Sequence, residues 1–427
     1  MWPANRADQL IVASMPCDST ARRGHPRWRH PGLLLAAALA AVLAVAGTPA
    51  AAVAATPLVS AAPARAVGFD GLVYTSAYVG STVYLGGSFR NAIVDGRLVP
   101  RKRLAALDAR TGALLPWAPA TNGTVLTLAR AGSSLYVSGK FTTVGGQPRA
   151  GLASVGLTTG AVGPFRHTLQ GTGYAFATDG GWLYLGGSFS AVDGRPARNL
   201  AAFRLADGTS DAGFRGDADG QVKTLAVAGN RLYVGGAFRR LTGADGTARL
   251  AALRLGDGLL DAGFRPVTPY PAFALTITAD RVYAGLAGVG GRVAAYRADG
   301  GLAWSTVTDG DVQAITYLRG AVYAGGHFTV ACPRPSRTAT SWCPATLRSQ
   351  PKLMALDASN GWLLDWNPRS NGKWGVLTMN ANASLRTIAV GGEFTAFGGA
   401  SRPHFAQFAT TATCGYACGG RPGTRAR

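Results

Sequence analysis

The chain has 427 residues, of which 59 are glycine and 23 are proline, and its formal net charge is +21 although only 15% of its residues are charged. Glutamate occurs once, as Glu393, so the residues that favour helices are scarce and a helix bundle or coiled coil is excluded. The hydrophobic share of 47% is too high for a disordered chain, and the glycines lack the three-residue period of collagen. A turn-rich, all-β protein remains.

The first 66 residues differ from the rest of the chain. Arg22 and Arg23 precede an uncharged apolar run over residues 33–46, and small residues follow up to Ala64-Arg65-Ala66. A basic stretch, an apolar stretch and such a small-residue site predict a secretory signal peptide over residues 1–66. The alternative is an uncleaved N-terminal anchor, because apolar residues continue to Ala55. Either arrangement predicts an extracellular or cell-surface protein.

Seven copies of one pattern follow, each an apolar strand that ends in Gly-Gly or a variant and continues to phenylalanine after one residue. The fifth copy lacks the phenylalanine, and the seventh has alanine where the others have tyrosine. A period near fifty residues predicts a repeat architecture. The pattern is centred on positions 84, 136, 184, 233, 283, 323 and 388.

Each copy contains the elements of four short strands. An apolar strand precedes the central pattern, a strand such as Leu104–Leu107 follows it, and Asp-Gly turns lead to a last segment with an aromatic residue. We therefore predict one seven-bladed β-propeller of four-stranded antiparallel blades over residues 67–412, with six blades as the alternative. Residues 67–70, or those just before them, could complete the last blade and close the ring.

Residues 205–214 and 255–264, each Leu-x-x-Gly followed by an Asp-Ala-Gly-Phe sequence, carry a family resemblance. They resemble the delta-60 repeat of secreted bacterial β-propellers, loosely over residues 72–408 and well over 200–265. The copies with Trp117 and Trp366 resemble Kelch/Rax2-like Gly-Gly-x-Phe blades. The resemblance implies an exported propeller, and it implies no catalytic residues.

Four cysteines lie beyond the leader, an even number that suggests two disulfides in an exported chain. Three pairings are possible, and proximity favours Cys332 with Cys343 and Cys414 with Cys418. A zinc site is the alternative, although the spacings fit no standard structural site. Residues 413–427 form a cysteine-containing C-terminal tail.

The common catalytic motifs do not occur. There is neither a G-x-S-x-G elbow nor an H-E-x-x-H sequence, and three histidines follow the leader. We therefore expect no catalytic residue, no cofactor and no metal site, and a binding protein rather than an enzyme. A polysaccharide hydrolase or lyase built on aspartates is the alternative. Turn formation explains the aspartates that recur at one repeat position, namely Asp108, Asp207, Asp257, Asp299 and Asp357.

Basic side chains recur just before the third strand of each copy. Each could serve its own blade structurally, or together they could form a basic ring on one face of the propeller that attracts an anionic partner. Without residues 1–66 the chain keeps 36 basic and 19 acidic residues. These binding candidates are Arg103, Arg149, Arg198, Arg249, Arg292, Lys352 and Arg402.

The residue between the glycines and the phenylalanine varies among copies, as expected for a position that faces solvent or a ligand. Its charged or titratable members, Lys140, His327 and Glu393, are further binding candidates. A long insertion that includes Cys332 and Cys343 and extends to Gln350 is another, because long loops on rigid scaffolds often carry recognition.

Together these features predict an exported, non-catalytic monomer. Its predicted partner is an anionic cell-wall polymer or polysaccharide, or an extracellular protein, bound through one face. Nucleic acid fits the charge but not the predicted export, and no membrane span is expected after cleavage of the leader. An assembly scaffold is a third class of function.

Overall fold

The computed structural model describes residues 56–288, 290–338, 340 and 342–410. Most of the predicted signal peptide, up to residue 55, and the predicted Cys414–Cys418 pair lie outside these residues. The described residues form strands and loops only, which confirms the all-β prediction. None of them forms a helix that is long and apolar enough to cross a membrane.

Antiparallel sheets of three or four main strands follow one another along the chain, and we number them one to seven. From first strand to last they are β2 (Val73–Val79), β3 (Thr82–Gly87) and β6 (Leu104–Asp108); β7 (Thr124–Ala131), β8 (Ser134–Lys140) and β11 (Leu152–Gly156); β12 (Leu169–Thr178), β13 (Trp182–Val192) and β15 (Leu200–Arg204); β16 (Val222–Ala228), β17 (Arg231–Gly236) and β18 (Leu250–Arg254); β19 (Ala272–Ile277), β20 (Val282–Leu286), β21 (Arg292–Tyr296) and β22 (Leu302–Val307); β23 (Val312–Leu318), β24 (Ala321–Gly326) and β27 (Leu353–Asp357); β28 (Gly375–Asn382), β29 (Thr387–Glu393) and β32 (Phe405–Ala409).

Shorter strands occur in the loops between the main strands and ahead of the first sheet. They pair with strands that are near in the sequence, and they lie along one rim of the ring. They are β1 (Gly68–Phe69), β4 (Asn91–Val94), β5 (Arg97–Pro100), β9 (Thr143–Val144), β10 (Gln147–Pro148), β14 (Arg195–Pro196), β25 (Val330–Ala331), β26 (Arg348–Ser349), β30 (Ala396–Phe397) and β31 (Ala400–Ser401).

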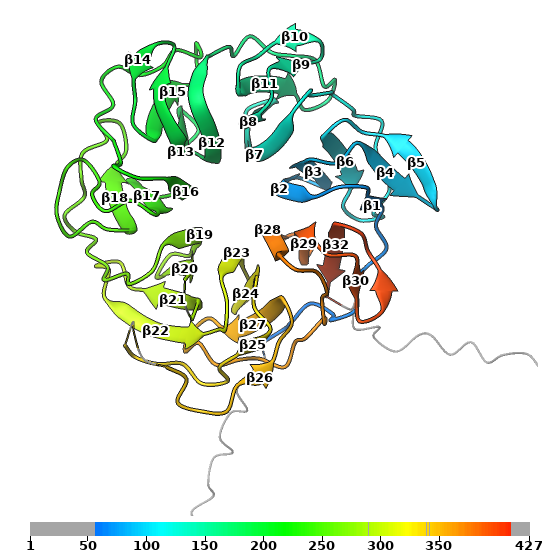
Figure 1. Ribbon diagram of the computed structural model, residues 1–427, viewed down its shortest axis with the longest axis vertical. Helices are drawn as coiled ribbons and strands as arrows, with labels where there is room; N and C mark the ends of the chain where they lie inside the picture. Colours follow the sequence, from blue (N-terminus) through cyan, green and yellow to red (C-terminus); the bar gives the residue numbers. More distant parts are fainter. Residues whose placement is uncertain (1–55, 289, 339, 341, 411–427) are drawn as a thin grey trace, which may run out of the picture. The chain divides into compact units, whose positions relative to one another are not determined.

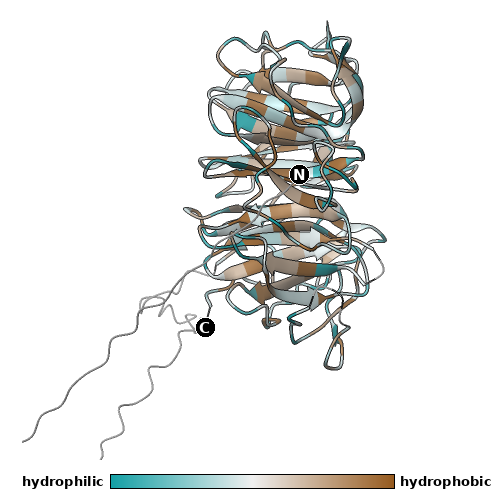
Figure 2. Cartoon of the chain, turned by 90° about the vertical axis from the view of Figure 1, so that its left-hand side faces the viewer, coloured by the Kyte–Doolittle hydropathy of each residue, from teal (hydrophilic) through white to brown (hydrophobic). Residues whose placement is uncertain are grey.

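The main sheets are arranged radially (Figure 1). The first strand of each sheet contacts the first strand of the next, and β28 of the seventh sheet contacts β2 of the first, so the ring is closed. A separate hydrophobic cluster fills each junction between neighbouring sheets. Figure 2 shows the sheets from the side, with hydrophobic residues mainly on the strands and hydrophilic residues mainly on the loops.

The tyrosine of the repeat pattern packs against the aromatic residue of the fourth segment. Tyr84 and Trp117 meet edge to face, with ring centroids 5.0 Å apart, and Trp117 Nε1 donates to Gly156 O of the next sheet at 2.9 Å. This edge-to-face geometry is one that aromatic pairs prefer. The repeated aromatic residues therefore join neighbouring sheets. The other pairs are Tyr136–Phe165, Tyr184–Phe214, Tyr233–Phe264, Tyr283–Trp304 and Tyr323–Trp366.

The first glycine of the pattern lets adjacent sheets approach closely. A Cβ on Gly86 would come within 2.7 Å of Val125 Cγ1 in the second sheet. A Cβ on Gly391 would come within 2.6 Å of Val73 Cγ1 across the closing junction. Glycine is therefore required by packing at these positions, not by a positive φ.

The ring is closed by residues that precede the predicted start of the propeller. Ser60 N donates to Ala409 O at 2.8 Å, and Ala64 N donates to Gln407 O at 2.7 Å, so this segment pairs with β32. Val59 is buried in the cluster between the sixth and seventh sheets. The folded unit therefore includes residues that a boundary between 66 and 67 would assign to the leader. Residues 68–69 instead pair with β4.

Candidate functional site

The position between the glycines and the phenylalanine lies at the end of the second strand of its sheet. The following phenylalanine is buried in all six copies that have it, whereas the variable residue points away from the core. Lys140 is exposed, and His327 and Glu393 are half-buried. These three residues therefore lie on the rim where second and third strands are joined.

Three of the predicted basic residues immediately precede a third strand. Arg103, Arg249 and Lys352 have φ angles of 73°, 69° and 68°. Arg103 Nη1 donates to Thr121 O at 2.7 Å, Arg249 Nη1 to Thr268 O at 3.4 Å, and Lys352 Nζ to Lys373 O at 3.4 Å. Each acceptor lies in the segment that leads into the next sheet. These side chains therefore tie neighbouring sheets together.

Arg149 and Arg402 occupy a different position, one that is shared with Arg101. Arg149 Nη2 donates to Gly163 O at 2.9 Å, and Arg402 Nε donates to Ala64 O at 3.2 Å. Both acceptors belong to the outermost segment of the same sheet. Arg101 makes the same contact with Leu115 O at 2.7 Å, although its position was not recognised in the sequence.

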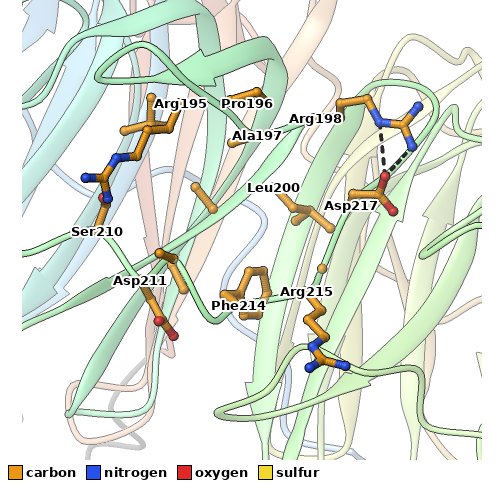
Figure 3. Close-up of a pocket in the computed structure, with 15 residues that line it drawn as sticks. Arg195, Pro196, Ala197, Arg198, Leu200, Ser210, Asp211, Phe214, Arg215 and Asp217 are labelled. Carbon is orange, nitrogen blue, oxygen red and sulfur yellow. Dashed lines mark hydrogen bonds and ion pairs between the residues drawn. The ribbon is translucent and has the colours of Figure 1, made fainter.

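Arg198 and Arg292 differ again. Arg198 forms an ion pair with Asp217 at a cavity of about 500 Å³, with Arg195 and Arg215 on opposite sides (Figure 3). Arg292 lies in β21, is almost fully buried, and its guanidinium is 5.2 Å from the centroid of the Tyr270 ring. The expectation that the seven basic residues share one position is therefore wrong, because the loops before the third strands differ in register. Their role in ligand binding stays a prediction.

The recurring aspartates form turns. Asp108 Oδ1 accepts hydrogen bonds from the backbone amides of Arg110 and Thr111, at 2.9 and 2.8 Å. These bonds lower the pKa of Asp108. Hydrogen bonds of this kind, two or three residues onward, occur at each of the other four positions, Asp207, Asp257, Asp299 and Asp357.

Three predicted residues come together between the sixth and seventh sheets. His327, Lys352 and Glu393 all contact the segment Lys373–Trp374, which leads into β28. The rings of His327 and Trp374 are 5.5 Å apart, and Trp374 N donates to Glu393 Oε2 at 2.5 Å. We call these five residues the rim cluster.

Trp374 and Lys373 are the exposed residues of the rim cluster. Half of the surface of Trp374 is accessible, and Lys373 Nζ lies 5.4 Å from the centroid of the Trp374 ring. Lys352 is buried beneath: burial lowers the pKa of its amine, while the charges of Asp309 and Glu393 oppose this effect. The cluster thus presents an indole flanked by an ammonium and an imidazole, on a base fixed by hydrogen bonds.

The insertion between β24 and β27 supplies a second exposed indole on the same rim. The Cys332–Cys343 disulfide is present, as predicted, and the segment after Cys332 pairs with β22 through Ser305 and Ser336. Trp342 is 72% exposed, and its ring lies 3.4 Å from where a Cβ on Gly290 would be.

Trp374 was missed in the sequence, although a signal for it was present. The segments before the first strands read Thr-Asn-Gly-Thr-Val or Thr-Asp-Gly-Asp-Val in two other copies, whereas the last copy reads Ser-Asn-Gly-Lys-Trp-Gly-Val. The two additional residues include Trp374. A departure from repeat length at an exposed aromatic residue indicates a site rather than a structural requirement.

The comparisons with known proteins identify the fold. The chain is similar to the WD40 β-propeller domain of Doa1, with 12% identity and a TM-score of 0.50, over 83% of this chain and 97% of that one. It is also similar to a chain of a mitotic checkpoint complex, with 13% identity and a TM-score of 0.52, over 83% and 96% of the two chains. No family model and no curated protein matches the sequence. The protein is therefore a β-propeller.

Proposed function

We propose that this protein is an exported, non-catalytic seven-bladed propeller that binds an anionic cell-surface polysaccharide through the rim cluster and Trp342. The observation that carries the proposal is the half-exposed Trp374, set between Lys373 and His327 on a rigid base. An indole face offers a large apolar surface to a sugar ring, and the adjacent Lys373 ammonium attracts carboxylate or phosphate groups.

The net charge of the chain supports the proposal of an anionic ligand. Without residues 1–66 the chain keeps 36 basic and 19 acidic residues, and this net charge of +17 raises the local concentration of polyanions and speeds their association at low salt. The basic leader pattern and the Cys332–Cys343 disulfide support export. The Asp-Gly turns of the third and fourth sheets support the delta-60 repeat type, and the Gly-Gly-x-Phe copies support the Kelch-like variant.

Titration of the full chain with polygalacturonate and with neutral dextran, at two salt concentrations, tests the proposal. We expect binding of polygalacturonate only, weaker at high salt, and at least about tenfold weaker in Trp374→Ala. Trp362→Ala is the matched control, because Trp362 is 48% exposed and has Arg334 5.5 Å from its ring, but follows β27 at the end remote from Lys352.

Three results would replace the proposal. Equal binding by wild type and Trp374→Ala would remove the rim cluster from recognition. Loss of a cross-linked extracellular protein in Trp374→Ala, without any binding of polygalacturonate, would establish a protein partner instead. Turnover of the polysaccharide that is lost on replacing one aspartate would establish the hydrolase or lyase alternative.

A further inference from the structure

The innermost strands of the sheets share an irregularity. In each one the pairing with the second strand skips a residue, between Val73 and Thr75 in β2 and between Val222 and Thr224 in β16, for example. The same shift occurs in β7, β12, β19, β23 and β28. A bulge of this kind redirects the side chain of the skipped residue.

All the skipped residues line one central cavity of about 180 Å³. Three are aromatic, namely Tyr74, Tyr174 and Phe273, and two are leucines, Leu126 and Leu377. The remaining two are Gln313 and Lys223. Since tyrosine, leucine, phenylalanine and glutamine all serve at this position, the fold does not require a lysine there.

Lys223 is the cationic residue that lines this cavity. Its Nζ lies 4.3 Å from the ring centroid of Tyr174 and 5.9 Å from that of Phe273. It makes no hydrogen bond or ion pair with any residue in the described part of the chain, and the lining includes no aspartate or glutamate. An ammonium has three donors, and no residue in the described part of the chain accepts from them, so they are available to a ligand in the cavity.

We infer that the central cavity binds a small organic carboxylate, with the anionic group on Lys223 Nζ beside the rings of Tyr174 and Phe273. The volume of about 180 Å³ is far above the ~10–15 Å³ that a single water needs on the same measure, which leaves room for one small organic acid. Burial lowers the pKa of the Lys223 amine, and a bound carboxylate would offset that cost. This site is separate from the rim cluster and does not depend on it.

Titration of the full chain with benzoate and with its uncharged analogue benzamide tests the inference. We expect benzoate to bind at least about tenfold more tightly than benzamide, and Lys223→Met to abolish this difference. Methionine fills the space of the lysine stem, so the variant should remain folded. Lys102→Met removes an exposed cation that does not line the cavity and should leave benzoate binding unchanged.

The pH dependence provides a second measurement. Lys223, Tyr74 and Tyr174 are the titratable groups that line the cavity. Benzoate affinity should fall as pH rises through the titration of Lys223, whereas benzamide affinity should not change over that step. Equal binding of benzoate and benzamide, unchanged benzoate binding in Lys223→Met, or no binding of benzoate would each overturn the inference.

Discussion

Ser138 and Gly173 face each other across the junction between the second and third sheets. Here the larger residue lies on the second strand and the glycine lies on the next sheet, which is the reverse of the other junctions. Elsewhere a glycine of the second strand faces a larger residue of the next sheet, such as Gly86 with Val125 or Gly325 with Val376. Here the second strand has Ser138, and the next sheet has Gly173, where a Cβ would overlap Ser138 Oγ. The junction keeps its close packing because the two changes compensate.

This compensation predicts strong coupling between two substitutions. Gly173→Val alone should lower the free energy of unfolding by about 1–3 kcal/mol through overpacking. Ser138→Gly alone should lower it by about 1 kcal/mol, because the 2.8 Å hydrogen bond from Ser138 Oγ to Gly151 O is lost. The double variant restores the arrangement of the other junctions, so it should be more stable than the sum of the two single effects by about 1 kcal/mol or more.

Urea denaturation of the four proteins measures this coupling. Ser133→Gly, on the exposed turn of the same hairpin, is the matched control and should add independently to Gly173→Val. Additive effects of Ser138→Gly and Gly173→Val would show that the two residues do not share one space.

Deletion of residues 56–66 should destabilise the ring. The deletion removes buried Val59, the backbone pairing with β32, and the acceptor of the 3.2 Å hydrogen bond from Trp366 Nε1 to Ser60 O. We expect a loss of about 3 kcal/mol or more in the free energy of unfolding, together with a red shift of tryptophan fluorescence as Trp366 becomes hydrated.

A synthetic peptide of residues 56–66 provides the control for this deletion. Added to the truncated protein, it should restore the fluorescence, and a peptide with Val59→Asp should not. Unchanged stability after the deletion would mean that the segment is dispensable. If the chain is exported, the expected loss of stability would also place signal cleavage before Val59.

Acid should weaken the contact between Asp309 and the segment Thr329–Val330, which lies at the rim between the fifth and sixth sheets. Burial alone would raise the pKa of Asp309, but hydrogen bonds from the Thr329 hydroxyl and from the amides of Val330 and Thr329 outweigh it and hold this pKa below its usual 3.8. The stabilisation of the folded protein by ionised Asp309 is therefore fully present above pH 3.8. It is lost as the pH falls through the lower pKa that Asp309 has in the folded protein.

Asp309→Asn should reduce this acid sensitivity at little cost near neutral pH. Asparagine already occupies the corresponding position in two other copies, where Asn122 Nδ2 donates to Thr142 Oγ1 at 2.7 Å and Asn371 Nδ2 to Thr395 Oγ1 at 2.8 Å. Denaturation at pH 7 and pH 3 compares the two proteins. Asp365→Asn, at a fully exposed carboxylate, is the control, and an unchanged acid response in Asp309→Asn would contradict the assignment.

The disulfide of the insertion should contribute measurable stability. Cys332 and Cys343 are 11 residues apart in sequence, so replacing both by serine should cost about 3 kcal/mol on the chain-entropy model. Denaturation under non-reducing conditions measures the loss, and peptide mapping identifies the bond. Wild type treated with a reductant should match the double variant, and identical stability of all forms would show that the bond does not restrict the unfolded chain as this model requires.

The sequence predicted the repeat unit because the features that define it are local. Tyr84, Gly86 and Phe89 lie within one strand and its end, and each has a packing role that recurs in other sheets. The register of the basic residues was not accessible, since it depends on loop lengths and on positive φ angles such as that of Arg103. The closing segment was also hard to place, because Ser60 pairs with the far end of the chain.

The candidate sites were only partly predictable for a related reason. His327 and Glu393 stood out because they vary within a constant pattern, but their common neighbour Trp374 lies in the next repeat. Lys223 sits between Val222 and Thr224, the same Val-x-Thr sequence that surrounds Tyr74, Leu126 and Leu377. The sequence therefore contained the bulge, but only the closed ring brings those residues to one cavity.

The pairing of Ala64 with β32 has a consequence for biosynthesis. The hydrogen bond from Arg402 to Ala64 spans 338 residues, so the earliest part of the folded unit to leave the ribosome must wait for nearly the last. Until Phe405–Ala409 emerges, Val59 lacks its cover and the seventh sheet lacks its outer edge. A nascent chain stalled before that point should therefore remain an open arc that is susceptible to proteases and to pairing with other chains.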